Sequence, residues 1–349
     1  MRTFGRILNH AAPDHARPDE RRSARSLAPS RGAILAWAAV VFMAGLLLPS
    51  PAPADEFFGD FLYWKTTEPV DWVLNTNRLP IDQYVAYETI DYHFAPGLRV
   101  GFTREGQWNS RFSYTRHRTR AADRASGNLT PAFLGGKTAL SDIPSPAPAY
   151  FDDGQVEAVI DYNVLDWDLY RPSRPNRAFA TRPVFGLKAA WIDQTFDSAF
   201  QGEWIDDLVT KSMTEHIQNR FWGIGPKLGV ENAWTVWRGQ EGEIRCTADF
   251  FAAYLVGHWT VNDVSDMTTT VVGVPFTSRR VIPIAGRDFG ALTFQATVGI
   301  HVKYRHWSAT AGYELHDWLD QCQLFDDATG PHNNDLLLQG LTARISYRF

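Results

Sequence analysis

The sequence predicts an all-β protein that forms a single antiparallel transmembrane β-barrel of about ten strands, within a range of eight to twelve. The clearest strand is Thr293–Arg305, where apolar and polar side chains alternate over thirteen residues. Soluble strands average about five or six residues, whereas a tilted membrane strand needs about 9–11 in the apolar zone. No apolar run beyond residue 54 is long enough for a membrane helix, so any span there has to be made by strands.

The first 54 residues have the organisation of a signal peptide. A basic region rich in arginine precedes a run of 16 apolar residues at 33–48, and Pro49–Pro53 end that run. Ala52-Pro53-Ala54 then supplies small residues at the two positions that a signal peptidase reads. A single membrane anchor is the alternative, but the run is shorter than the about 20 residues of a spanning helix. We therefore predict two parts, a signal peptide at 1–54 and a barrel at 55–349.

Ten segments have the polarity pattern of strands. In chain order they are Phe57–Lys65, Leu98–Phe102, Trp108–Thr115, Gln155–Tyr170, Val184–Asp197, Arg220–Trp234, Glu243–Val256, Thr293–Arg305, Trp307–His316 and Leu341–Phe349. Tyr84–Phe94 and Thr268–Ile282 are candidates for one further pair. The last segment alternates strictly and finishes on an aromatic residue, as in a strand that closes an outer-membrane barrel. We expect the barrel assembly machinery to recognise Tyr347 and Phe349 there.

The connections between these segments alternate in length. Long connections fall at about 66–96, 117–154, 198–219, 257–288 and 320–335, and short ones near 105–107, 171–183, 235–242 and 305–306. Outer-membrane barrels have short periplasmic turns and long external loops, and a soluble sandwich has no reason to sort its loops in this way. With both termini in the periplasm, every long connection lies outside the cell. The predicted location is the outer membrane of a Gram-negative-type bacterium, in contact with its lipid.

The composition agrees with this location. The chain has 13 Trp, 12 Tyr and 22 Phe, enough for two interfacial girdles of aromatic residues. Its formal net charge is −5, and no basic stretch suggests nucleic acid as a partner. Cys246 and Cys322 are too few for a disulfide framework, and their strands place them near opposite ends of the barrel.

Charged side chains on the predicted inward faces suggest a wet lumen whose field acts on solutes. We expect eight of them to line the lumen: Arg99, Arg111, Glu157, Asp161, Lys188, Lys303, Glu314 and Arg344. The alternative is a closed barrel filled by salt bridges. About eight strands leave room only for side chains and 16–18 leave an open channel, so ten strands lie near the closed end.

An enzyme is a third class, because some ten-stranded outer-membrane barrels are proteases or lipid-modifying enzymes with His and carboxylate groups near the outer rim. His316-Asp317 lies at the outer end of a predicted strand, as do Asp91 and His93. With ten histidines in the chain, a neighbouring His and Asp arise easily by chance. We therefore predict no catalytic residue, no metal and no cofactor.

Several segments resemble the Legionella-type major outer membrane protein family of pore-forming barrels. They are Gly59–Lys65, Asp161–Leu165, Gly186–Ile192, Phe221–Gly229, Ala311–Glu314 and Ser346–Phe349. The resemblance implies a porin-like barrel without a catalytic motif, which lets small hydrophilic solutes or ions diffuse passively. A non-conducting structural or adhesive barrel is the alternative. The solute and the oligomeric state stay open.

Overall fold

The computed structural model describes residues 55–349 except 79–82, 141–149, 173–177, 205–207, 286–288, 327–329 and 332–333. The predicted signal peptide lies outside the described residues. No helix in the described part is long and apolar enough to cross a membrane. The elements are β1 (Asp55–Thr67), β2 (Asp71–Arg78), β3 (Gln83–Thr89), β4 (Phe94–Arg104), β5 (Asn109–Pro131), α2 (Leu134–Leu140), β6 (Phe151–Tyr170), β7 (Phe179–Trp204), β8 (Val209–Arg238), β9 (Gly242–Val271), β10 (Val274–Ala285), β11 (Gly290–Tyr304), β12 (Trp307–Cys322), β13 (Phe325–Asp326), β14 (Gly330–Pro331) and β15 (Asn334–Arg348).

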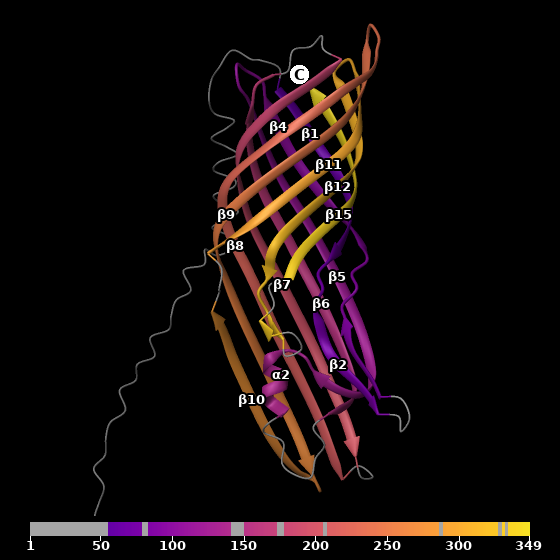
Figure 1. Cartoon of the computed structure of the whole chain (residues 1–349), viewed down its shortest axis with the longest axis vertical. Coiled ribbons are helices and arrows are strands. Elements are labelled where there is room, and N and C mark those ends of the chain that lie inside the picture. Colours follow the sequence, from indigo (N-terminus) through magenta and orange to yellow (C-terminus); the bar gives the residue numbers. More distant parts are fainter. Residues whose placement is uncertain are drawn as a thin grey trace, which may run out of the picture. The chain divides into compact units, whose positions relative to one another are not determined.

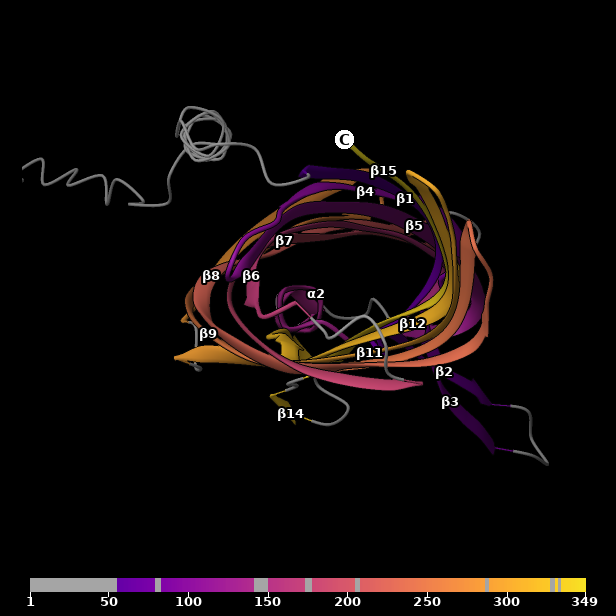
Figure 2. The same ribbon diagram turned by 90° about the horizontal axis from the view of Figure 1, so that it is seen from above.

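Ten antiparallel strands close into a barrel, which confirms the predicted fold class (Figure 2). The ring runs β1–β4–β5–β6–β7–β8–β9–β11–β12–β15, and β15 pairs with β1 to close it. Each of the ten predicted segments coincides with one of these strands, although Trp108, Arg305 and Phe349 fall one residue outside them. The two candidate extra segments do not widen the ring: β3 and β10 lie outside it, and they extend the sheet through β2 and β9.

The predicted long connections are largely strand. β8 and β9 are 30 residues each, and β5 continues through Pro131 where a loop was predicted from residue 117. Glycine, proline and polar residues in these segments suggested loops, but cross-strand pairing supplies the backbone hydrogen bonds there. We call the parts of the strands that lie in the predicted long connections the extensions. In Figure 1 the extensions, together with α2 and β10, lie at the bottom, while the C-terminus lies at the top.

Near the short turns, the barrel carries apolar side chains outside and polar side chains inside. Val298, Ile300 and Leu341 point outward and are more than half exposed. Trp307, Tyr347 and Phe349 form edge-to-face aromatic contacts on the same outer surface. A lipid-facing band with aromatic girdles has this arrangement.

In the extensions the two faces are exchanged. On β6, Val156, Ala158 and Ile160 point inward and are buried, while Glu157 and Asp161 point outward. We call the buried apolar cluster of this half the outer core; its largest members are Trp64, Trp72, Tyr92, Phe133, Phe151, Tyr162, Phe196, Phe200, Phe221, Trp259 and Trp318. Outside a membrane a sheet is stable with a dry inside and a wet outside, so the exchange places these extensions beyond the apolar band.

Connections that fold inward complete the outer core. Val70 and Tyr92, from the segments between β1 and β4, are buried in it, as is Leu324 after β12. The α2 helix lies inside the ring of strands (Figure 2). Cys246 and Cys322 are both free, the first exposed and the second buried.

Two adjacent glycines hold α2 against the barrel wall. The backbone N–H of Gly135 donates to Asp263 Oδ2 at 2.7 Å, and that of Gly136 donates to Glu215 Oε1 at 2.5 Å. A Cβ at Gly135 would lie 2.2 Å from Asp263 Oδ1, so a larger residue would have to move the Asp263 carboxylate or the helix.

Candidate functional site

A cavity of about 500 Å³ occupies the barrel interior on the side of the short turns. All ten barrel strands contribute to its wall, and it extends to the short-turn end at Glu105, Pro172 and Arg348. Eight Lys or Arg and seven Asp or Glu side chains line it. Charges inside a membrane protein are costly unless they are paired or hydrated, so their gathering here marks the cavity as the candidate functional site.

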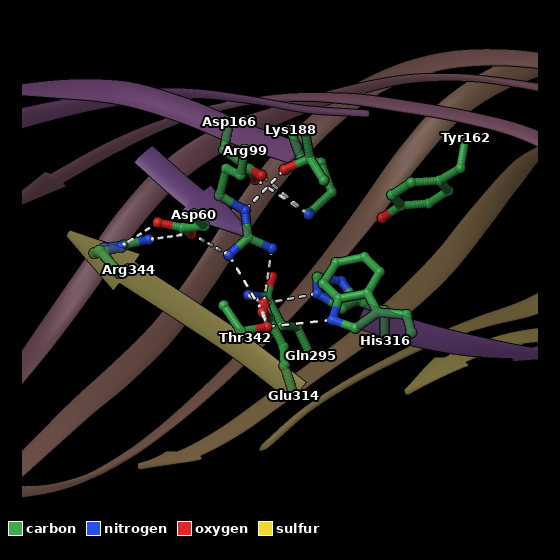
Figure 3. A network of polar contacts seen from close by, with 12 residues as sticks. Asp60, Arg99, Tyr162, Asp166, Lys188, Gln295, Glu314, His316, Thr342 and Arg344 are labelled. Atoms are coloured by element: carbon green, nitrogen blue, oxygen red, sulfur yellow. Dashed lines mark hydrogen bonds and ion pairs between the residues drawn. The ribbon is translucent and has the colours of Figure 1, made fainter. Parts of the chain in front are cut away.

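One cluster of ion pairs lies at the end of the cavity nearest the outer core (Figure 3). Arg99 of β4 makes a bidentate contact with Glu314 of β12, at 2.9 and 3.2 Å, and its Nη1 lies 3.0 Å from Asp60 Oδ2. Arg344 of β15 donates to the same Asp60 from Nε and Nη2, at 2.7 and 2.9 Å. Planar guanidinium groups that meet carboxylates in this way form the strongest class of charged hydrogen bond.

Glu314 is the centre of this cluster. Besides Arg99, it accepts hydrogen bonds from Gln295 at 2.9 Å and from Thr342 at 2.8 Å, and His316 Nε2 lies 2.8 Å from it. The Glu314 side chain is 1% exposed. Because a buried carboxylate is stable only when its oxygens are satisfied, these partners fix the position of Glu314 on the wall.

A second cluster connects β5, β6, β7 and β8. Lys188 and Lys227 approach Asp166 Oδ1 at 3.1 and 2.9 Å, and Lys227 also lies 2.9 Å from Asp168. Arg111 contacts the same Asp168 at 2.8 Å. A further carboxylate, Glu231, accepts from Arg111 at 2.7 Å and from Arg182. Several strands are thereby held in one charged network.

The outer core begins directly beyond these clusters. Trp64 and His316 pack with ring centroids 4.8 Å apart, and the indole N–H of Trp318 donates to the hydroxyl of Tyr162 at 3.3 Å. All four side chains are buried. The charged cavity is therefore separated from the outer end of the barrel by packed aromatic groups.

Six of the eight predicted lumen residues lie inside the barrel. Arg99, Glu314 and Arg344 share the first cluster, Arg111 and Lys188 belong to the second, and Lys303 lines the cavity near its mouth. Lys188 is 1% exposed and is packed behind the lining side chains.

The prediction was wrong for Glu157 and Asp161, which point outward from β6. Asp161 lies 3.7 Å from Arg118 and Glu157 lies 3.0 Å from Arg120, both on the outer face of β5. The prediction assumes that charge faces the lumen along the whole strand. In the extension the charged face is the outer one, because the outer core fills the inside.

Sequence reasoning missed five inward carboxylates and amines of the two clusters: Asp60, Asp166, Asp168, Lys227 and Glu231. One signal was present in the sequence. An unbroken strand cannot turn both an odd and an even position to the same side, so Asp161 and Asp166 had to lie on opposite faces.

The rim residues considered for catalysis are not assembled into a pair. His316 points into the barrel toward Glu314, whereas its neighbour Asp317 lies on the other face of β12. Asp91 pairs with Lys65 at 3.0 Å. Among the described residues, no group of three or more His, Cys, Asp or Glu side chains is arranged to hold a metal ion.

Comparison with solved structures gives distant likenesses. The outer membrane protease OmpT from Escherichia coli is 9% identical, with 86% of this chain and 99% of OmpT covered, at a TM-score of 0.38. The toluene transporters TodX of Pseudomonas putida and TbuX of Ralstonia pickettii are 10% and 9% identical; each likeness covers 86% of this chain and 90% of the transporter, at a TM-score of 0.21. At these TM-scores the likenesses carry no argument. No curated protein matches the chain.

A sequence model of one protein family matches most of the chain. The model described as the Legionella pneumophila major outer membrane protein precursor matches residues 47–349. That range includes all ten strands of the closed ring and the outward apolar band. The chain therefore belongs to the Legionella pneumophila major outer membrane protein family and is an outer-membrane β-barrel.

Proposed function

We propose that the protein is a porin-like channel for small hydrophilic solutes or ions, and that its outer core holds it closed in the conformation seen here. The cavity carries this proposal, because a charged, water-accessible space that reaches the short-turn end provides the short-turn part of a polar path through the barrel. The path ends at Trp64, Trp318 and the other aromatic groups of the outer core.

The charges of the cavity indicate which solutes fit. Eight basic and seven acidic side chains line it, so the two signs nearly cancel. Most are paired with each other, which leaves local fields without a strong overall sign. Zwitterionic and neutral polar solutes fit such a lining better than ions of one sign.

Trp64 and Trp318 belong to strands β1 and β12, so opening requires these side chains to repack, and the departure of an inserted connection from the outer core would give them room. The α2 helix is suited to this, because it spans only seven residues and is held by the packing of Ala139 and Leu140 and by polar contacts to Glu215 and Asp263. A short helix gains little stability of its own and depends on such contacts.

The second candidate is a non-conducting structural barrel, and the outer core favours it. The large aromatic side chains of this cluster are less than 2% exposed, as in the interior of a soluble protein. A barrel with this filling is stable without any solute path.

The two candidates differ in one experiment. The full chain is produced in a Gram-negative host, purified from outer membranes and reconstituted into liposomes, and entry of a small zwitterionic amino acid is followed by swelling. Gly135→Val should displace α2, because its side chain would collide with Asp263. Gly59→Ala is the matched control, since a Cβ there meets no atom within 4 Å.

The channel proposal expects slow swelling with the wild type and with Gly59→Ala, and faster swelling with Gly135→Val. If all three folded proteins leave the liposomes unchanged, the structural barrel replaces the channel. If the wild type already swells them as fast as Gly135→Val, a channel is present but the outer core does not close it.

A further inference from the structure

The outward face of β5 carries a row of arginines where the strand leaves the apolar band. Arg116, Arg118 and Arg120 occupy alternate positions, Arg124 follows on the same face beyond Ala122, and all four are exposed. Alternate residues of a strand project from the same face about 7 Å apart, so the four guanidinium groups form one basic stripe. The stripe begins two residues after Tyr114, the last aromatic residue on this face of β5.

A wall of stacked aromatic side chains lies directly below the stripe. Tyr114 stacks on Trp191 with ring centroids 5.9 Å apart, and Phe112 stacks on Trp167 at 5.7 Å. The Tyr114 hydroxyl donates to Asn163 Oδ1 at 2.8 Å. Two residues of a tilted strand rise about 5 Å along the barrel axis, so Arg116 lies at the level where lipid chains give way to headgroups.

The arginines nearest the aromatic wall form only weak ion pairs, or none with their register neighbours, on the outer face of the barrel. Arg116 stands in register with Leu98 on one side and Asn163 on the other, and neither is acidic. Arg118 lies 3.7 Å from Asp161 with 58% of its side chain exposed, and Arg120 lies 3.0 Å from Glu157 with 66% exposed. Exposed ion pairs contribute little, so a stronger anion can take over these guanidinium groups.

We propose that Arg116 and Arg118 bind the phosphate groups of a phosphorylated glycolipid of the outer leaflet, whose acyl chains lie against Leu98, Tyr114 and the aromatic wall. Arginine is suited to phosphate because its planar fork donates two parallel hydrogen bonds. A lipid fits better than a soluble phosphate compound, because the apolar wall adjoins the charges and faces the membrane. Asp161 stands in register with Arg118, so the phosphate has to displace it there, and Glu157 farther out repels a second anion, so the site is confined to the membrane border.

Binding of lipid A to the full chain tests the proposal. The protein is purified from outer membranes, exchanged into neutral detergent, and titrated with bisphosphorylated lipid A, with dephosphorylated lipid A and with inorganic phosphate. Arg116→Gln/Arg118→Gln is compared with Arg124→Gln, which removes an arginine of the same face next to Gln155 and farther from the wall.

We expect the wild type and Arg124→Gln to bind bisphosphorylated lipid A alike, and the double variant to bind it about tenfold or more weakly, the equivalent of losing one charged hydrogen bond. Arg116→Lys, which keeps the charge and loses the fork, should fall between them and remains informative if the double variant does not fold. Equal binding by wild type and double variant, or equal binding of the dephosphorylated lipid, would overturn the proposal. Inorganic phosphate that binds as tightly as the lipid would also overturn it, since the site would then not be a lipid site.

Discussion

At the scale of single residues, Glu68 couples the outer core to pH. It lies between β1 and β2, beyond the apolar band, and is 1% exposed. Burial raises the pKa of Glu68 to about 8, while the hydrogen bond donated by Gln194 opposes part of that rise. Because the folded protein keeps this proton longer than the unfolded chain does, the contribution to stability is complete below pH about 4.5 and is lost as pH rises toward 8.

We therefore expect the free energy of unfolding to fall between pH 5 and pH 8, and the Glu68→Gln variant to lose much of that fall. Gln194 donates from Nε2 to Glu68 and accepts at Oε1 from Asn219, so an amide at position 68 can stay within this set of hydrogen bonds. Urea unfolding in detergent at several pH values measures the effect. Identical pH profiles for wild type and Glu68→Gln would contradict the assignment.

Neighbouring residues of β11 test the two faces of the barrel wall. Val298 points outward with 59% exposure, and Thr297 lines the cavity. Arginine on the lipid face near the membrane centre costs about 2–4 kcal/mol, so Val298→Arg should lower the free energy of unfolding by that amount. Thr297→Arg enters a charged, hydrated space and should cost far less. Refolding titrations in lipid vesicles compare the two, and equal losses would show that the faces are assigned wrongly.

At the scale of elements, α2 is the part of the outer core that a single change can release. Asp263, Glu215 and Ser265 contact the backbone of its first two glycines. Gly135→Val should displace the helix and expose Lys137 in its last turn, so trypsin should cleave there much faster than in the wild type. Gly59→Ala should leave the rate unchanged. Unchanged cleavage in Gly135→Val would mean that these contacts do not hold the helix.

The final strand allows a second test at this scale. Phe349 packs on Phe57 with ring centroids 5.7 Å apart, and its N–H donates to the Asp55 carbonyl at 3.0 Å, next to the β1–β15 seam. We expect deletion of Phe349 to lower the amount of heat-modifiable protein in outer membranes while the periplasmic amount is maintained. If the deletion variant reaches the same yield in outer membranes as the wild type, Phe349 is not part of the assembly signal.

Alternation of polarity was sufficient to predict the ten barrel strands, because period 2 identifies a two-faced strand wherever it occurs. It does not say which face points inward. In β6, Asp166 points into the cavity and Asp161 points away from it, and only packing against the outer core decides between them. The ion pairs were also beyond prediction, because Arg99 meets Glu314 across 215 positions of the chain.

At the scale of the whole molecule, the near balance of charge in the cavity predicts weak ion selectivity. In the Gly135→Val background, a salt gradient across a bilayer should give a reversal potential close to zero. Lys303 lies near the mouth, so adding Lys303→Glu should shift the potential toward cation preference. A strong preference for one sign before that change would contradict the assignment of the cavity as the path.

Single-channel recording of the purified full chain in a planar bilayer tests whether the charged cavity is a solute path that the outer core closes. We predict long silent periods for the wild type, interrupted by rare discrete steps, and frequent steps of the same size for Gly135→Val. Silence from a folded, heat-modifiable Gly135→Val protein would show that the barrel has no solute path and is structural.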